Sequence, residues 1–387
     1  MSTSLNRPPH EWLLYGAYGY TGRLLADEAL RRGHRPILAG RDRARLEAFR
    51  DELPGSPLEI RAFALDDPDE IARGLEGVRA VLHAAGPFVR TGIPMMEGCL
   101  RAGADYLDIT GEVPVFEAAF ERSERAREAG VRLMPGVGMD VIPTDGIAAL
   151  LAGAMPEATR LELALQSPGP PSAGTLQTVL EGIPGGLFVR RGGRLVRRNP
   201  GRREFRRRVD FGPVPGEGPM AGRLGGERSV APYTWGDLAT AWRTTGIDDI
   251  TCYMATPAWQ VRLLPVALPL LRGLLSLAPL RRAARRRVAA GPAGPDREAR
   301  RTGRSRAWGR VEDGTGRAEE AVLELPEGYS FTALAGVRAL EALLALEEEP
   351  VGALTPAGTF GVGWVLDLPG VEVVRTTAPI LARPATS

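Results

Sequence analysis

No lysine occurs in this chain of 387 residues, so all 49 of its strongly basic residues are arginine. A Walker A loop, a pyridoxal Schiff base and the Tyr–Lys pair of short-chain dehydrogenases each require a lysine, so these classes of enzyme are excluded. Histidine and cysteine are also scarce: the chain has three histidines and two cysteines, and their spacing is not that of metal ligands. We therefore expect no metal site.

The chain also lacks a large excess of positive or negative charge, since its formal net charge is +2. Charge alone gives no reason to expect a nucleic-acid partner. Apolar residues make up 44% of the chain and charged residues 25%, an ordinary composition for a protein with two hydrophobic cores. No charged and apolar leader opens the chain, so we expect a short disordered tail at residues 1–9 and a cytoplasmic protein.

A glycine-rich turn follows the first apolar segment. Residues 12–15 are typical of a strand and residues 23–32 of a helix, and the turn between them contains three glycines at a spacing of three. Glycine lets the backbone turn tightly and approach a pyrophosphate, which then binds the N–H groups at the helix N-terminus. The turn therefore predicts a dinucleotide-binding loop. Its expected cofactor contacts are Gly16, Tyr18, Gly19, Tyr20, Thr21 and Gly22.

The end of the next strand, residues 36–39, indicates which nicotinamide cofactor binds. An acidic residue there would accept hydrogen bonds from the ribose 2′-hydroxyl of NAD and repel a 2′-phosphate. The chain has Gly40 and Arg41 instead, with Arg43 and Arg45 nearby, and a guanidinium can bind a phosphate through two charge-assisted hydrogen bonds. The alternative is that these arginines form the solvated start of the next helix. Because the acid is missing and the base is present, we expect NADP (NADPH).

Small residues and acids follow two further strands of the predicted sheet. The expected strand at residues 80–85 ends in Ala85 and leads into Gly86 and Pro87, at the strand end where a parallel sheet binds its ligand. We expect Ala85, Gly86 and Pro87 to contact the cofactor. The segment 105–112 is a strand that ends in acids. Strands and helices alternate throughout this half of the chain. We therefore predict an α/β fold with a doubly wound parallel sheet, the Rossmann arrangement.

Five segments of the chain form a specific combination: residues 16–22, 38–41, 85–88, 105–112 and 138–145. Together they resemble the saccharopine dehydrogenase-like family of oxidoreductases, in particular the branch of trans-acting enoyl reductases of lipid biosynthesis and their lipid-droplet-associated relatives. The resemblance implies an NADP-dependent oxidoreductase with an N-terminal Rossmann domain and a last helix that returns to that domain.

One position departs from the pattern of this family. Relatives commonly place an aspartate near the adenine after the third strand, and the matching residue here is Ala64. Asp66 or Asp67 can take over this contact, and we expect Asp66 to be a cofactor-binding residue.

The second half of the chain predicts an α+β domain. Strands are expected at residues 161–166 and 249–255, and a hairpin at residues 303–325. We expect this domain to bind the substrate and to form a homodimer. The expected division is a Rossmann domain at 1–145, an α+β domain at 146–350 and a segment at 351–387 that returns to the Rossmann domain.

Two segments of the second half each allow two interpretations. Ten arginines between residues 190 and 208 would attract nucleic acid or acidic lipid, but the run lacks the aromatic interleaving that base stacking requires, which favours a solvated surface. Residues 261–280 are strongly apolar, although proline and arginine interrupt them, and five arginines follow at 281–287. Core burial is the commoner use of such segments and favours a buried or dimer-forming helix. The alternative is a peripheral anchor on anionic lipid through residues 261–287.

Hydride transfer needs a group that supplies or removes a proton near the reacting carbon. The candidate catalytic residues are the polar side chains expected at the cofactor edge. They are Tyr106, Asp108, Glu112 and Asp140, with Tyr233 as a further proton donor. Carboxylates at strand ends also cap helices or tie loops, so a structural role is the alternative for each.

Three functions are compatible with these residues. The first is the NADPH-dependent reduction of an enoyl or carbonyl group in a small, lipid-like substrate. The second is imine reduction of the opine or saccharopine type, which needs paired cationic groups for the carboxylates of the substrate. The third is a nucleotide-binding scaffold at a lipid surface, without turnover.

Overall fold

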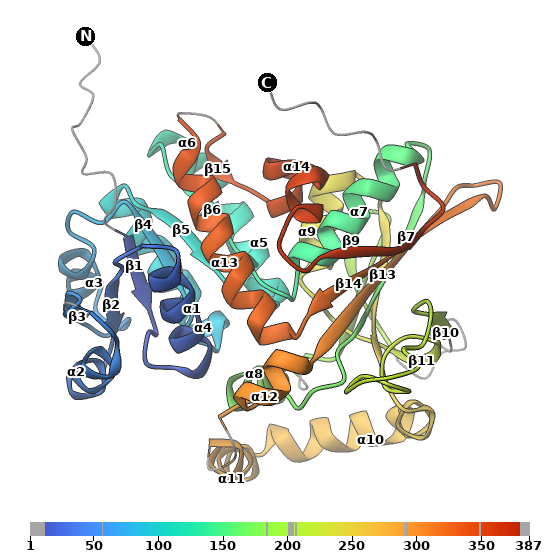
Figure 1. Cartoon of the computed structure of the whole chain (residues 1–387), viewed down its shortest axis with the longest axis horizontal. Helices are drawn as coiled ribbons and strands as arrows, with labels where there is room; N and C mark the ends of the chain where they lie inside the picture. Colours follow the sequence, from blue (N-terminus) through green and yellow to red (C-terminus); the bar gives the residue numbers. More distant parts are fainter. Residues whose placement is uncertain are drawn as a thin grey trace. The chain divides into compact units, whose positions relative to one another are not determined.

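The structure of the chain is a computed structural model (Figure 1). It describes residues 12–55, 57–182, 185–199, 205, 207–289, 291, 293–347 and 350–379. The expected tail at residues 1–9, and Arg202, Arg203 and Arg206 of the basic run, lie outside the described residues.

Two compact units make up the described chain. The first comprises residues within 1–110, 114–138 and 332–354. The second comprises residues within 111–113, 139–331 and 355–387. Each unit is built on a sheet of its own, and the chain passes between the units five times.

A parallel sheet forms the first unit. Its strands, among the described residues, are β1 (Trp12–Tyr15), β2 (Ile37–Gly40), β3 (Ile60–Ala62), β4 (Ala80–His83), β5 (Asp105–Asp108), β6 (Arg132–Met134) and β15 (Gly352–Ala353). They follow the order β15-β6-β5-β4-β1-β2-β3, and all neighbours are parallel. Strands β1, β2, β4 and β5 are buried along their whole length, as expected for a parallel sheet with both faces covered. This arrangement confirms the predicted Rossmann sheet.

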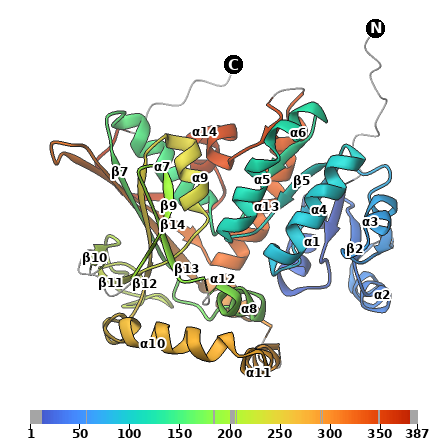
Figure 2. The same cartoon turned by 180° about the vertical axis from the view of Figure 1, so that it is seen from behind.

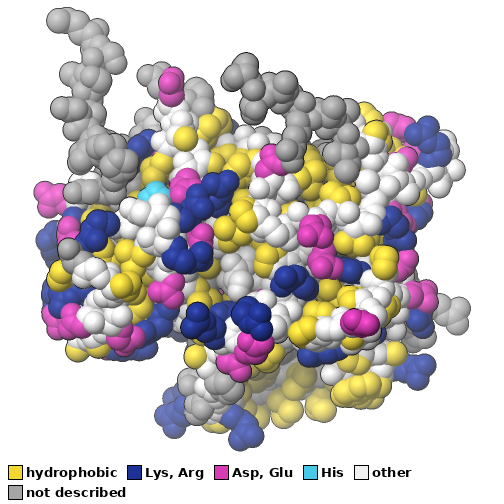
Figure 3. All heavy atoms as spheres, in the orientation of Figure 1, with side chains coloured by type: hydrophobic (Ala, Val, Ile, Leu, Met, Phe, Trp, Pro, Cys, Tyr) yellow, Lys and Arg dark blue, Asp and Glu magenta, His cyan; other side chains and the backbone are white. Residues whose placement is uncertain are grey.

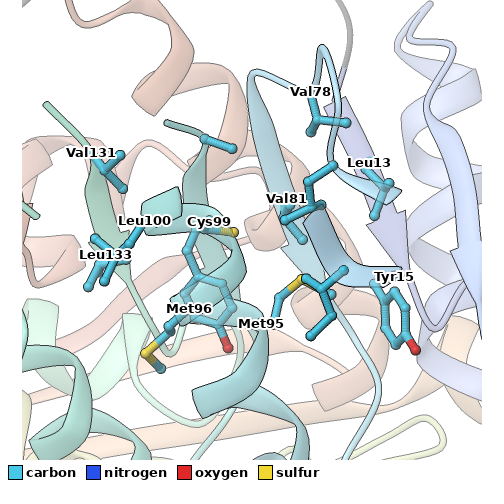
Figure 4. Packing of buried hydrophobic residues seen from close by; sticks show 14 of the residues in the cluster. Leu13, Tyr15, Val78, Val81, Met95, Met96, Cys99, Leu100, Val131 and Leu133 are labelled. Carbon is cyan, nitrogen blue, oxygen red and sulfur yellow. The ribbon is translucent and has the colours of Figure 1, made fainter. Parts of the chain in front are cut away.

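Helices cover the two faces of this sheet. They are α1 (Tyr20–Arg31), α2 (Arg43–Glu52), α3 (Pro68–Gly74), α4 (Phe88–Ala102), α5 (Val113–Glu121), α6 (Ser123–Glu128) and α13 (Gly328–Ala345). Helix α4 illustrates the packing: Met95, Met96 and Cys99 repeat at helical spacing, are fully buried, and pack in one cluster with Val81 of β4 and Leu133 of β6 (Figure 4). The cluster fixes the strands whose ends carry the predicted site.

Residues 332–354 complete the first unit. Strand β15 joins the edge of the sheet beside β6. Glu341 of α13 accepts two hydrogen bonds of 2.7 Å from Arg32 and contacts Nε2 of His34 at 2.8 Å. The chain therefore returns to the Rossmann sheet through this segment, whereas the expected division assigned all of it up to residue 350 to the second domain.

A mixed sheet forms the second unit. Its strands, among the described residues, are β7 (Arg160–Gln166), β8 (Leu187–Arg191), β9 (Arg194–Arg198), β10 (Arg207–Asp210), β11 (Glu227–Pro232), β12 (Asp249–Ala255), β13 (Arg304–Glu312), β14 (Ala318–Pro326) and β16 (Glu372–Thr376). The main order is β10-β11-β12-β7-β13-β14-β16, and β7 and β12 are parallel. Strands β13 and β14 form the predicted hairpin, paired from Arg304 opposite Pro326 to Glu312 opposite Ala318.

The helices of the second unit include one that was expected elsewhere. They are α7 (Ile142–Ala154), α8 (Ala173–Gly182), α9 (Asp237–Thr245), α10 (Ala258–Ser276), α11 (Ala278–Ala289), α12 (Arg297–Thr302) and α14 (Pro356–Leu366). Helix α14 packs on α7: the N–H of Ala357 donates to Asp145 Oδ2 at 3.0 Å. A Cβ atom at Gly146 would lie 2.6 Å from Cγ1 of Val365, so glycine is needed for this close approach. Helix α14 is grouped with the second unit, whereas β15, in the same expected C-terminal segment, joins the Rossmann sheet.

Two interpretations of the arginine-rich and apolar segments also need correction. Arg190 is buried, its Nη1 donates to the carbonyl of Gly193 at 2.6 Å and its guanidinium lies 4.3 Å from the ring centroid of Trp242, so the solvated-surface interpretation is wrong for this residue. Helix α10 lies along the outside of the second unit in both views (Figures 1 and 2). Leu275 is its one buried residue, so the interpretation as a buried helix is wrong.

Candidate functional site

The turn between β1 and α1 depends on its glycines. Gly16 has a φ of +84°, and a Cβ atom there would lie 2.9 Å from the backbone N of Ala85. A Cβ atom at Gly22 would lie 2.1 Å from the carbonyl oxygen of Gly16. Both substitutions would clash with backbone, because real Cβ atoms essentially never approach so closely. The sequence motif is thus required by the shape of the turn.

The first turn of α1 is suited to an anion. Gly19 is its N-cap residue and provides no side-chain hydrogen bond to the helix. An α-helix leaves the N–H groups of its first turn without acceptors inside the helix, and these groups carry the positive end of the helix dipole. Tyr20 and Thr21, which open the helix, are partly exposed. This turn has the shape and donors that a pyrophosphate requires.

Two arginines accompany Tyr18 at the end of β2. The Tyr18 ring lies over Gly40, where a Cβ atom would be 2.8 Å from Tyr18 Cε1. The guanidinium of Arg45 lies 4.3 Å from the centroid of the same ring, a cation–π contact. Arg41 is exposed beside them, and Asp42 accepts a hydrogen bond from the Arg45 N–H at 3.1 Å as the cap of α2. The structure thus gathers the positive charge that a 2′-phosphate needs.

The aspartates after β3 have different environments. Asp67 accepts hydrogen bonds from the N–H groups of Asp69 at 2.8 Å and Glu70 at 3.4 Å, and so caps α3. Asp66 is exposed. Of the two alternatives for the adenine contact, Asp67 is therefore occupied by its helix and Asp66 fits better.

The turn Ala85-Gly86-Pro87 is fixed by Thr91 of α4. The Thr91 hydroxyl donates to the carbonyl of Ala85 at 2.6 Å, and Nε2 of His83 lies 3.0 Å from the same hydroxyl oxygen. Because the hydroxyl has a single proton, Nε2 of His83 is the donor in the second contact. Burial lowers the pKa of His83 to about 3, so this histidine is neutral. It holds the turn in place.

Tyr106 and Asp108 are bonded to each other inside the first unit. Both are fully buried, and the Tyr106 hydroxyl donates to Asp108 Oδ2 at 2.6 Å. Asp108 Oδ1 accepts hydrogen bonds of 2.9 Å from the N–H groups of Thr110 and Gly136. Three donors therefore converge on this carboxylate, an arrangement that fixes the loops after β5 and β6.

Glu112 and Asp140 are each the second residue after a point where the chain enters the second unit. Both side chains are partly exposed. Burial and, to a smaller extent, the charge of the neighbouring Glu112 carboxylate raise the pKa of Asp140 to about 7. Glu112 accepts a hydrogen bond of 3.1 Å from the hydroxyl of Thr178 on α8. The second unit thus holds a carboxyl group that exchanges its proton near neutral pH.

Two aromatic residues after β11 accompany Asp140. The indole N–H of Trp235 donates to the backbone carbonyl of Asp140. Tyr233 packs edge-on against Trp235, with ring centroids 4.9 Å apart. Burial, and then the charge of Asp140, raises the pKa of Tyr233 to about 12, so this hydroxyl keeps its proton at neutral pH. Sequence reasoning named Tyr233 as a proton donor but missed Trp235, for which the sequence holds no signal.

Two further acids of the second unit are buried. Asp237 accepts a hydrogen bond of 2.9 Å from the Thr144 hydroxyl, and burial holds its pKa well above the ordinary value. Burial raises the pKa of Asp145 to about 6. Sequence reasoning missed both acids, although Asp145 ends one of the five segments that carry the family resemblance.

Comparison with known families decides the nature of the first unit. Residues 12–134 match the family model described as the saccharopine dehydrogenase NADP binding domain. This part of the chain is similar to that NADP-binding domain. The NADP-binding domain includes every predicted cofactor contact from Gly16 to Pro87, and it confirms the prediction of NADP, while the individual contacts stay predictions.

Curated relatives are similar over about a third of the chain. A probable mitochondrial saccharopine dehydrogenase-like oxidoreductase of Arabidopsis thaliana is 33% identical over 158 residues, which are 37% of this chain and 35% of the relative. A trans-acting enoyl reductase of Mycobacterium ulcerans is 32% identical over 140 residues, 35% of this chain and 34% of the relative. The chain thus spans about a third of the length of the curated relatives it matches.

A solved structure is similar over nearly the whole chain. Apo histidine-tagged saccharopine dehydrogenase (L-Glu forming) from Saccharomyces cerevisiae has a TM-score of 0.59 and 12% sequence identity, and the match covers 95% of this chain and 100% of that one. At this identity the likeness shows the fold. It confirms the predicted Rossmann domain followed by a second domain with a mixed sheet.

Proposed function

We propose that the protein is an NADPH-dependent oxidoreductase that reduces an enoyl or carbonyl group of a lipid-like substrate. The observation that carries this proposal is the group formed by Asp140, Glu112 and Tyr233 in a chain that also has an NADP-binding domain. The names of the mycobacterial relatives support the enoyl group as the reducible function.

The cofactor contacts follow from the first unit. The pyrophosphate would bind the first turn of α1, and Arg41 and Arg45 would bind the 2′-phosphate through charge-assisted hydrogen bonds. Asp66 would accept a hydrogen bond from the adenosine part. When bound, NADPH supplies a hydride.

Asp140 would supply the proton. A general acid works best when its pKa lies near the working pH, and the pKa of Asp140 is raised to about 7. Glu112 keeps that pKa high through its charge, and Thr178 holds Glu112 in place. Tyr233 keeps its proton at neutral pH, so its hydroxyl can donate a hydrogen bond to the carbonyl oxygen of the substrate.

Tyr106 and Asp108 take a different part in this proposal. Their mutual hydrogen bond and complete burial suit positioning residues, which hold the loops that lead to Glu112 and Asp140. We assign direct contact with substrate to Asp140 and Tyr233, and a positioning role to the Tyr106–Asp108 pair.

The acidic surroundings of Asp140 favour a substrate without carboxylates near the reacting carbon. Glu112 is its charged neighbour, and Tyr233 and Trp235 present aromatic surface. Imine reduction of the opine type would bring substrate carboxylates that two acids repel. A conjugated enoyl or keto group on an apolar chain fits this environment better.

A turnover screen tests the proposal. NADPH oxidation at 340 nm would be measured with enoyl thioesters, ketones and imines, and substrates that lower the absorbance would be confirmed by product mass. Thermal shift with NADPH and with NADH would run in parallel. We expect NADPH to raise the melting temperature more than NADH does, and we expect turnover of enoyl or keto compounds. Asp140→Asn should abolish this turnover and leave the thermal shift with NADPH unchanged. NADPH binding without turnover of any substrate would indicate the scaffold function, and preferred turnover of imines would overturn the proposed substrate class.

A further inference from the structure

Helix α10 presents an apolar stripe to solvent. Trp259, Leu263, Val266, Leu270 and Leu274 follow one another at spacings of three and four residues, which places them on one face of the helix. All five are exposed, with relative exposures of 62% for Trp259, 74% for Val266 and 62% for Leu270. Figure 3 shows hydrophobic side chains gathered at the lower edge of the molecule, where Figure 1 places α10. Contiguous apolar surface of this kind is typical of a binding site.

The opposite face of α10 already has a partner. Val261, Leu264 and Leu268 are partly buried and Leu275 is buried, and the helix packs on β11 of its own unit. The helix is therefore docked along the fold by one face while the other face remains apolar and exposed. Apolar residues on both faces distinguish α10 from an ordinary surface helix, which has a polar outer face.

Positive charge accompanies this stripe without any acid. Between Asp249 and Asp296 every charged residue is an arginine. These arginines are Arg262, Arg272, Arg281, Arg282, Arg285, Arg286 and Arg287. The last five lie on α11, which follows α10 after one residue and packs against it. The segment thus combines an exposed apolar face with a helix rich in arginine and free of acidic residues.

The apolar stripe and the arginines together indicate which kind of partner could cover this surface. A second copy of the chain would bring two arginine-rich segments together, and like charges oppose such an interface. By length and composition α10 is the described helix that could cross a membrane, but it contains Arg262, Arg272, Pro265 and Pro269 and is docked on its own sheet. An anionic lipid surface satisfies both features, because acyl chains accept the stripe and headgroup phosphates bind the arginines.

We propose that α10 and α11 form a docking surface for anionic lipid bilayers. Helix α10 lies flat at the boundary between headgroups and acyl chains with Trp259, Val266 and Leu270 inserted. The arginines of α11 bind headgroup phosphates beside it. Apolar insertion provides the contact area, and the arginines select negatively charged lipid. This surface lies wholly in the second unit and does not depend on the proposed reaction.

Vesicle flotation of the full chain tests this proposal. The vesicles are phosphatidylcholine alone, or phosphatidylcholine with phosphatidylglycerol, each at low and high salt. We expect flotation with the anionic vesicles and a decrease at high salt, because screening weakens the arginine contacts. Absence of flotation with anionic vesicles, or equal flotation with both kinds, would overturn the proposal.

Two sets of variants test the apolar stripe and the arginines of α11 separately. Leu263→Gln with Val266→Gln and Leu270→Gln removes the stripe, and Arg286→Glu with Arg287→Glu reverses two exposed charges. Each set is expected to lower the vesicle partition coefficient by roughly tenfold or more, since each basic residue near an anionic surface contributes substantially to binding. Arg73→Glu with Arg101→Glu makes the same change of net charge on the first unit and should leave flotation unchanged. These positions are exposed, so the variants should fold, which circular dichroism checks.

A measurement of self-association tests the alternative that a second copy of the chain covers α10. Sedimentation velocity without lipid would be compared for the wild-type chain and the stripe variant. An unchanged oligomeric state supports the lipid surface. Conversion of a wild-type dimer into monomers by the stripe variant would show that a second copy covers α10, and would overturn the proposal.

Discussion

The carboxylate of Asp140 lies directly against the backbone of Gly111: a Cβ atom at residue 111 would be 2.8 Å from Asp140 Oδ2. A side chain at this position must displace the carboxylate. Gly111→Ala is therefore expected to lower kcat by roughly tenfold, because small misplacements of a reacting group are costly. The thermal shift with NADPH should persist. Gly153→Ala, on α7 in open space, is the control for a glycine substitution, and equal kcat values in the two variants would contradict the role of Asp140.

The pH dependence of turnover should report the titration of Asp140. Its pKa is raised from the ordinary value of 3.8 to about 7, and the acid form donates the proton. We therefore expect kcat/KM to be constant below pH 7 and to fall above it. Glu112→Gln removes the charge that helps to raise this pKa, so the fall should begin at lower pH. A profile that Glu112→Gln and Asp140→Asn both leave unchanged would assign the titration to another group.

Two tyrosines should respond in opposite ways to loss of their hydroxyls. Tyr233 is partly exposed beside Asp140, so Tyr233→Phe is expected to lower kcat by roughly tenfold to a hundredfold with little loss of stability. Tyr106 is fully buried and bonded to Asp108, so Tyr106→Phe should destabilise the fold by about 1–3 kcal/mol. Steady-state kinetics and thermal unfolding measure the two effects. A larger kinetic than structural effect of Tyr106→Phe would restore this residue as a catalytic candidate.

The choice between NADPH and NADH should depend on Arg41 and Arg45. Removing both guanidiniums is expected to raise the Kd for NADPH by roughly tenfold or more, as loss of charge-assisted hydrogen bonds does. The Kd for NADH should change little, since NADH has no 2′-phosphate. Arg43 is a matched control: it is exposed, and its side chain faces Glu47 of the same helix at 4.0 Å. Isothermal titration of Arg41→Ala/Arg45→Ala and of Arg43→Ala with both cofactors decides the matter, and a parallel rise for NADH would contradict the assignment.

Buried Asp145 should make the fold less stable as pH rises. Burial raises its pKa from the ordinary 3.8 to about 6, so the folded chain binds this proton more tightly than the unfolded chain. The resulting stabilisation is complete below pH 3.8 and is lost as pH rises through about 6. From pH 5 to pH 8 this group alone should lower the free energy of unfolding by about 1–2 kcal/mol. Asp145→Asn should flatten the dependence in denaturant titrations, whereas Asp51→Asn, on the exposed part of α2, should not.

Local patterns in the sequence were sufficient for the first unit. The glycines at 16, 19 and 22, and the arginine at 41, have a chemical requirement that can be recognised without neighbours in space, and the structure shows each in its predicted element. The alternation of apolar segments gave the parallel sheet in the same way. These features depend on residues that are close in the chain.

Contacts between distant parts of the chain escaped prediction. Asp237 joins Thr144 across 93 residues, and α14 packs on Gly146 from more than 200 residues away. Arg190 belongs to a run whose composition is typical of a solvated surface. Its guanidinium nevertheless packs on the ring of Trp242 and donates a hydrogen bond to the carbonyl of Gly193. Composition and periodicity carry no information about which distant residue supplies a partner, so these positions could not be assigned from the sequence.

The carboxylate of Asp108 connects two stretches of polypeptide that are 26 residues apart, because the N–H groups of Thr110 and Gly136 bond to one oxygen atom. Thr110 is the last residue before one exit from the first unit, and Gly136 lies two residues before another. Both exits consequently share a single anchor. A backbone shift at Thr110 is therefore expected to be transmitted to Gly136 through one carboxylate oxygen.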